Sequence, residues 1–263
     1  MSIFSIKILA LITMLIDHIG EFFPHIPYVI FLRQIGRISA PLFLFVSAVG
    51  MRHSSSPKKY IKRLYLLSLI MGLGNSIITI IFPNNPVELT NNFPATIFII
   101  ACIAFIYMTR ERGENWGKYT KKFIFIQLLS LPLILIIENY LPPQISYAVY
   151  GIYPNIFTCE GGIFFVFMGL LLFMYCDDRK SLSIAYSALC AFYLLSEVIA
   201  IIIAKMPLTT LFASDVQWMM IFSLDFMLLY NGKKGSSNKF SKYLFYIFYP
   251  AHIWFLYIIS NFM

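Results

Sequence analysis

Long apolar segments recur along this chain, separated by short polar loops, and they restrict its fold more than any other feature. Each segment is close to the ~17–25 residues that a helix needs to cross a bilayer. The chain is 59% hydrophobic and 12% charged, whereas a soluble domain has about 25% charged residues. The sequence therefore predicts an all-α, polytopic transmembrane helical bundle with about nine spans, forming a single domain over residues 1–263. We place the spans near 3–23, 35–51, 64–82, 94–109, 123–141, 161–176, 182–203, 216–230 and 244–261.

The first segment shares features with a signal peptide, because Lys7 precedes an apolar run. However, Asp17 and His18 interrupt the region where a small-residue cleavage site would lie, and further spans follow. We therefore expect a retained first helix.

Basic residues lie almost entirely on one side of the predicted bundle. The loops 52–63, 109–122, 176–181 and 231–243 follow the even-numbered spans and, with Lys7, hold 17 of the 20 Lys and Arg residues. The positive-inside rule then predicts a multi-pass cell-membrane protein with its N-terminus and basic loops in the cytoplasm. The formal net charge of +8 is thus mainly a topology signal, and we expect the lipid bilayer rather than nucleic acid as a partner.

Several ionisable residues fall at a similar predicted depth in the outer half of the membrane. Asp17 and His18 lie five or six residues before the outer end of the first span, and Arg37 lies near the outer end of the second. Glu197 occupies the same layer on the seventh span, with His252 just below it on the ninth. Charged groups at membrane depth are costly and usually face one another or a functional pathway. An Asp17–Arg37 ion pair is one structural explanation that is compatible with a functional role.

Lys7 and His18 are eleven residues apart, which places them on one face of the first helix. At 1.5 Å per residue, His18 lies roughly 16 Å above Lys7. Asp17 is rotated by about 100° from His18, so we expect it to meet a different helix.

Histidine is the commonest general base near neutral pH. Acyl transfer from a thioester needs such a base, together with donors for the developing oxyanion, but it needs no enzyme nucleophile. The chain has no GxSxG motif, and its four cysteines fall in or beside apolar segments. No HExxH motif or CxxC spacing is present either, so we expect no metal.

Three blocks identify a family resemblance. KILALITMLIDHIG (7–20), LRQIGRISAPLFLFVSAVGM (32–51) and LFYIFYPAHIWFL (244–256) resemble the TraX family of bacterial membrane acetyltransferases. Lys7 and His18 are also similar to the basic-x10-His signature of membrane O-acyltransferases. The TraX resemblance implies transfer of acetyl from cytosolic acetyl-CoA to the N-terminal amine of a pilin-like or otherwise exported or membrane-inserted peptide or protein.

The resemblance also implies roles for individual residues. His18 is the expected base, and Asp17, Arg37 and His252 complete the catalytic group. Apart from the resemblance, the predicted topology leads us to expect that basic residues on the cytoplasmic side bind the acetyl-CoA donor and that three residues nearer the outer side bind the acceptor. The donor residues are Lys7, Arg52, Lys58, Lys62 and Arg63, and the acceptor residues are Arg33, Glu160 and Glu197.

Two alternative functions stay open at this point. One is O-acetylation of a cell-surface glycan, in which a sugar hydroxyl replaces the amine. The other is a proton-coupled transporter, in which Asp17, His18, Glu197 and His252 would relay protons.

Overall fold

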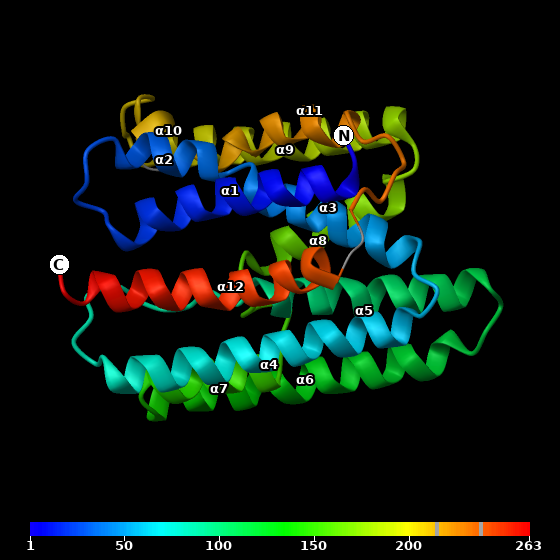
Figure 1. The fold of residues 1–263 in the computed structure, drawn as a ribbon, viewed down its shortest axis with the longest axis horizontal. Helices are drawn as coiled ribbons and strands as arrows, with labels where there is room; N and C mark the ends of the chain where they lie inside the picture. The colour runs from blue at the N-terminus through cyan, green and yellow to red at the C-terminus, as the bar shows by residue number, and fades with distance from the viewer. Residues whose placement is uncertain (214–215, 237–238) are drawn as a thin grey trace. The chain divides into compact units, whose positions relative to one another are not determined.

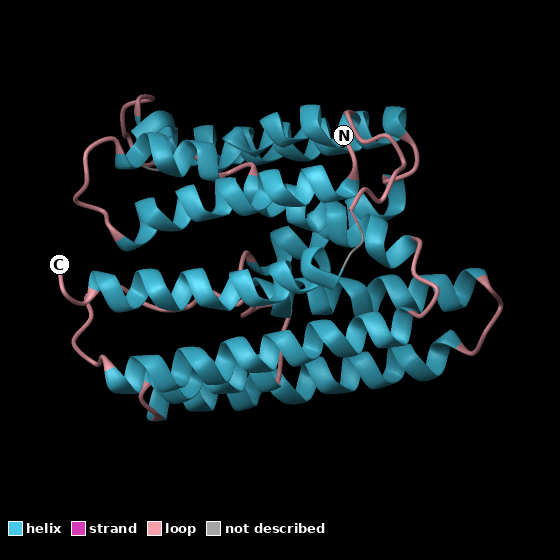
Figure 2. Cartoon of the chain, viewed as in Figure 1, coloured by secondary structure: helices cyan, strands magenta, loops and turns pink. Residues whose placement is uncertain are grey.

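The computed structural model describes residues 1–213, 216–236 and 239–263. The described residues form helices joined by loops and contain no β-strand (Figures 1 and 2). The elements are α1 Ile3–Phe22, α2 Val29–Gly36, α3 Ser39–Arg52, α4 Pro57–Ile81, α5 Phe93–Glu111, α6 Trp116–Tyr140, α7 Pro143–Ile152, α8 Gly162–Tyr175, α9 Arg179–Ile203, α10 Thr210–Ala213, η1 Gln217–Phe222, α11 Ser223–Leu228 and α12 Lys239–Ser260.

Within the described residues, seven helical stretches are long and apolar enough to cross a membrane. They are Ile3–Phe22, Val29–Arg52, Pro57–Ile81, Phe93–Glu111, Trp116–Tyr140, Arg179–Ile203 and Tyr243–Ser260. The predicted spans 161–176 and 216–230 form shorter apolar helices, α8 and the η1–α11 pair. The all-helical membrane fold is confirmed, whereas the count of nine spans is not.

Several predicted boundaries differ from the structure, and one of them is the start of α6 at Trp116 rather than near residue 123. Helix α4 begins at Pro57 rather than near residue 64, because proline is well suited to the first helical position and Lys and Arg are good helix formers. The second predicted span is interrupted by a turn at residues 37–38, which separates α2 from α3.

The chain folds as two compact units. Unit 1 comprises Met1–Val46 and Met174–Leu256, and unit 2 comprises Ser47–Phe173 and Tyr257–Met263. Unit 2 is held together by glycine contacts and buried amides. A Cβ at Gly72 of α4 would lie 2.6 Å from the Gly151 Cα of α7, so the two helices touch backbone to backbone. The side-chain amide of Asn75 donates to the carbonyls of Leu89 and Asn91, which fixes the loop before α5.

Unit 1 contains α1, α2, α9–α11 and most of α12, and it holds both histidines of the predicted layer. The buried hydroxyl of Tyr186 on α9 lies 2.9 Å from the Met220 carbonyl and 2.8 Å from the Ser223 hydroxyl. These contacts fix the η1–α11 segment against α9. Helix α2 packs closely along α1 and also contacts η1, and the α1–α2 contact builds the site described next.

Candidate functional site

Two buried histidines from opposite ends of the chain meet in unit 1. Nδ1 of His18 on α1 lies 2.8 Å from Nε2 of His252 on α12. Nδ1 of His252 lies 2.7 Å from the Phe248 carbonyl oxygen, one turn earlier. The two residues are only 5% and 6% exposed, so the contact between the rings is shielded from solvent.

This chain of contacts determines where the hydrogens lie in the neutral pair. A carbonyl oxygen only accepts, so His252 must carry its hydrogen on Nδ1. Its Nε2 is therefore an acceptor, and His18 donates to it from Nδ1. The lone pair of His18 then lies on Nε2, which makes no hydrogen bond among the residues that the structure describes. A histidine with a fixed tautomer and a free lone pair is suited to accept a proton.

The face of α1 that carries His18 also carries Lys7, as the sequence predicted. The Lys7 ammonium lies 5.0 Å from the centroid of the Phe245 ring of α12. Lys7 thus pairs with Phe245, and His18 pairs with His252 further along both helices. The two helices therefore run parallel, and both residues of the basic-x10-His spacing face α12.

The carboxylate of Asp17 binds two arginines, Arg33 of α2 and Arg37 directly after it. Its Oδ1 accepts from Nη2 of Arg37 at 2.6 Å and lies 3.2 Å from Nη1 of Arg33. Arg33 Nη1 also binds Glu21 at 2.8 Å. Arg37 Nη1 donates to the side chain of Gln217 on η1 at 2.9 Å. The Asp17–Arg37 pair suggested by the sequence is therefore present, within a cluster of two acids and two bases.

Two glycines allow α2 to approach α1 at this cluster. A Cβ on Gly36 would lie 2.2 Å from the Cβ of Asp17. A Cβ on Gly20 would lie 3.1 Å from Cδ of Arg33. Any side chain at Gly36 would therefore separate the helices where Asp17 meets Arg37.

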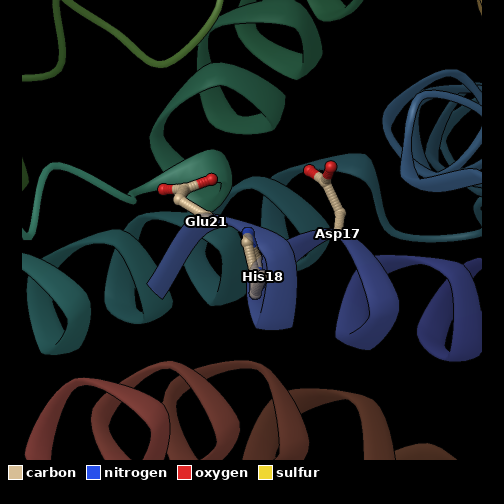
Figure 3. Close-up of side chains that lie close together, drawn as sticks. All are labelled: Asp17, His18 and Glu21. Carbon is tan, nitrogen blue, oxygen red and sulfur yellow. The ribbon is translucent and has the colours of Figure 1, made fainter. Parts of the chain in front are cut away.

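Asp17, His18 and Glu21 also form a group whose ligand atoms lie within 4.8 Å of one another (Figure 3). The two carboxylates extend to either side of the His18 ring in this view. Both acids already bind guanidinium groups, and His18 binds His252. Ion pairing and hydrogen bonding thus explain the cluster without a bound cation, and the expectation of no metal stays a prediction.

The TraX protein family model matches residues 2–260, nearly the whole chain. The chain belongs to the TraX family. The match confirms the resemblance carried by the three sequence blocks. The chain is also 29% identical over 259 residues to a curated protein described as "Probable fimbrial assembly protein FimC, serogroup H1" from Dichelobacter nodosus. This similarity covers 96% of the chain and 93% of the relative. No solved structure matches the chain.

The structure brings together all four residues that the TraX resemblance implied for catalysis. One expected donor-binding residue and one expected acceptor-binding residue lie in the same group of contacts. His18, His252, Asp17 and Arg37 lie in unit 1 with Lys7 and Arg33, in the contacts described above. Glu197 is buried on α9 of the same unit. The roles proposed for these TraX residues remain predictions.

The other predicted site residues of this TraX protein belong to unit 2. Glu160 accepts a hydrogen bond from the backbone N–H of Asn92 at 2.7 Å, where it caps the start of α5. Arg52 pairs with Glu111 at 3.6 Å, and the ammonium of Lys58 lies 5.6 Å from the centroid of the Tyr119 ring. Lys62 and Arg63 are exposed on the first turns of α4.

The sequence interpretation of this TraX chain did not assign Glu21, Gln217 or Phe248 to the site. Glu21 lies one turn after Asp17, a spacing that places two acids on one helix face. Phe248 likewise lies one turn before His252, so its carbonyl was a predictable partner. Gln217 gives no comparable signal, because its contact with Arg37 spans 180 positions.

Proposed function

We propose that this TraX protein is a membrane acetyltransferase that moves acetyl from acetyl-CoA to the N-terminal amine of a pilin-like or exported peptide. The observation that carries the proposal is the His252–His18 hydrogen bond. It fixes His18 in the tautomer whose Nε2 accepts a proton.

In the proposed step, the neutral amine of the acceptor attacks the carbonyl carbon of the thioester. A C–N bond forms, the C–S bond breaks, and CoA leaves as its thiolate. His18 Nε2 takes the proton from the attacking nitrogen, and this proton can then neutralise the thiolate. His252 accepts the hydrogen bond from His18 Nδ1 throughout, so it orients the base and stabilises the imidazolium.

Arg37 acts through Asp17 in this proposal. Its Nη2 binds Asp17, its Nη1 binds Gln217, and its Nε donates to the Arg33 carbonyl at 3.2 Å. These bonds use all three nitrogens of the guanidinium. Arg37 therefore holds the end of α2 against Asp17, which precedes His18 in α1. Arg37 is thus assigned a positioning role rather than contact with the reacting carbonyl.

Lys7 suits the phosphate-bearing end of the donor. It lies eleven residues before His18 on the α12-facing side of α1. A donor bound with its phosphates near Lys7 would extend its thioester along this face toward His18, roughly 16 Å away by the helical rise. Arg52, Lys58, Lys62 and Arg63 are further candidates for binding donor phosphates.

The relative supports a pilin-like acceptor. A protein named for fimbrial assembly matches nearly the full length of the chain, and the TraX resemblance independently implied acetylation of a pilin amine. A sugar hydroxyl would use the same base, so the acceptor has to be tested directly.

The test is an acetyl-transfer assay on purified protein in lipid nanodiscs with radiolabelled acetyl-CoA. The acceptors are a peptide with a free N-terminal amine, the same peptide with a blocked amine, and an oligosaccharide. We expect label only in the free-amine peptide, and none with His18→Ala. The matched control is His25→Ala, because His25 is an exposed histidine of the same unit.

Each other result has a distinct meaning. Label in the oligosaccharide alone would overturn the N-acetyltransferase proposal and favour glycan O-acetylation. Transfer at the wild-type rate by folded His18→Ala protein would exclude His18 as the base. No transfer to either acceptor and no binding of acetyl-CoA would favour the transporter.

A further inference from the structure

A pocket of about 240 Å³ opens beside the Asp17 cluster in unit 1. Arg33, Arg37 and Gln217 form its polar wall, and four apolar residues complete it. The apolar residues are Val29, Ile30, Ala213 and Val216. At about 30 Å³ per water molecule, the pocket has room for about eight waters, which is more than enough for one short acidic side chain. The mixed lining fits a group with a polar head and a short apolar stem.

Arg33 has hydrogen-bonding capacity that the protein does not use. A guanidinium carries five N–H donors. Arg33 directs only Nη1 at the protein, toward the Asp17 carbonyl, the Asp17 carboxylate and Glu21. Within the described part of the chain, Nε and Nη2 make no hydrogen bond. Its side chain is 29% exposed, so these donors can be reached by a ligand in the pocket.

The net charge of the Asp17–Glu21–Arg33–Arg37 cluster determines which kind of anion the pocket can bind most favourably. Arg33 and Arg37 are balanced by Asp17 and Glu21, so the cluster is neutral before a ligand binds. A carboxylate adds one negative charge, whereas a phosphate monoester adds close to two. A carboxylate also matches the planar two-donor edge of a guanidinium. The pocket therefore favours a carboxylate.

We infer that this pocket binds the carboxylate of an acidic side chain in the acceptor peptide, with Arg33 as the principal donor. The inference rests on the proposed acetyl transfer to a peptide and adds a specificity determinant to it. Arg33 also binds Asp17 and Glu21, whose carboxylates lie within 4.8 Å of a ring nitrogen of His18. A peptide held by Arg33 would therefore be anchored beside the base.

The first test measures binding without acetyl-CoA, so it does not depend on catalysis. A fluorescent peptide with glutamate among its first six residues is compared with the same peptide carrying glutamine there. We expect the wild-type protein to bind the glutamate peptide about tenfold more tightly, as for a hydrogen bond to a charged group. Arg33→Gln should abolish the difference. Arg112→Gln should retain it, because Arg112 is an exposed arginine of unit 2.

The second test repeats the comparison during acetyl transfer. We expect the glutamate peptide to have a KM about tenfold lower in the wild type and the two KM values to converge in Arg33→Gln. Arg33→Lys should restore part of the difference, because lysine keeps the charge but not the planar donor pair.

The outcomes separate the two proposals. Peptide discrimination that depends on Arg33, without acetyl transfer, would support the pocket and overturn the proposed function. Transfer with equal binding and equal KM for both peptides would support the function and overturn the pocket. Arg33-dependent binding of phosphatidylglycerol in nanodiscs, without peptide discrimination, would assign the pocket to a lipid phosphate and overturn this inference.

Discussion

Nδ1 of His18 and Nε2 of His252 lie 2.8 Å apart, although 234 positions separate the two residues in the chain. Because the Phe248 carbonyl accepts a hydrogen bond from Nδ1 of His252, Nε2 of His252 is the acceptor and Nδ1 of His18 is the donor in this contact. The pair resembles a catalytic base and its orienting partner rather than two packing residues. The role of each residue can be tested separately.

Replacing His252 should impair the chemical step more than substrate binding. His252→Phe keeps an aromatic ring between α1 and α12 but removes the acceptor for His18 Nδ1. We expect kcat for acetyl transfer to fall by about 10- to 100-fold, as for the loss of an orienting partner, with little change in KM. His252→Gln should recover part of this loss, because its amide oxygen can accept the hydrogen bond. Equal kcat values for His252→Phe and the wild type would contradict the orienting role.

Neutralising Asp17 should destabilise unit 1. Asp17→Asn leaves two partly buried guanidinium groups with a weaker partner, at a cost of about 2 kcal/mol in unfolding free energy. Glu21→Gln should cost less, because the Glu21 side chain is 27% exposed, whereas that of Asp17 is 16% exposed and pairs with both arginines. Unfolding in mixed micelles of increasing SDS content would measure both. A smaller loss for Asp17→Asn than for Glu21→Gln would show that Asp17 is not the centre of the cluster.

A methyl group at Gly36 should disrupt the same contact by overlap. The new Cβ would lie 2.2 Å from the Asp17 Cβ, and forced overpacking of this kind costs about 1–3 kcal/mol. We expect Gly36→Ala to lower the unfolding transition. Gly117→Ala is the matched control, because its Cβ would meet no atom closer than 3.9 Å. Equal transitions for the two variants would mean that α2 does not approach α1 through Gly36.

The start of α9 should depend on pH through Asp178. Its carboxylate accepts from the N–H groups of Lys180 and Ser181 and from the Ser181 hydroxyl. The hydrogen bonds with Ser181 are the main cause that lowers the pKa of Asp178 below its usual 3.8. A lowered folded-state pKa means that the stabilisation is present above the unfolded-state pKa and is lost as pH falls through the folded-state value.

Hydrogen exchange at the Lys180 and Ser181 amides would measure this capping contact. Corrected for intrinsic exchange rates, their protection should decrease below pH 4 in the wild type. In Asp178→Asn, which still caps the helix, protection should not change with pH over this range. A wild-type profile as flat as that of Asp178→Asn would refute the ionised cap.

Part of this site could be predicted from helix geometry alone. The eleven-residue spacing places Lys7 and His18 on one face, and both contact α12. The one-turn spacing of Arg33 and Arg37 likewise predicts that both can reach one partner, and Asp17 contacts both. These relationships are periodic within one helix, so the sequence is sufficient to predict them.

For residues on different helices, the sequence predicts only that they lie at a similar depth in the membrane, and not which of them are in contact. His18 and His252 were assigned to neighbouring layers, but their direct hydrogen bond depends on how α1 and α12 are rotated. The turn after Gly36 and the Gln217 contact with Arg37 depend on packing between α1, α2 and η1. Glu160 had a polar position typical of a binding residue, yet its carboxylate caps α5. Hydropathy does not distinguish these cases, because it reports burial and not partners.

The most direct test of the account is single-turnover acetyl transfer from acetyl-CoA to a free-amine peptide by His18→Ala, with and without added imidazole. We predict that the variant folds and is at least about 100-fold slower than the wild type, the scale of a lost general base. Imidazole should restore part of the rate by taking the place of the His18 ring. Wild-type transfer by folded His18→Ala protein without imidazole would contradict the central claim that His18 is the base.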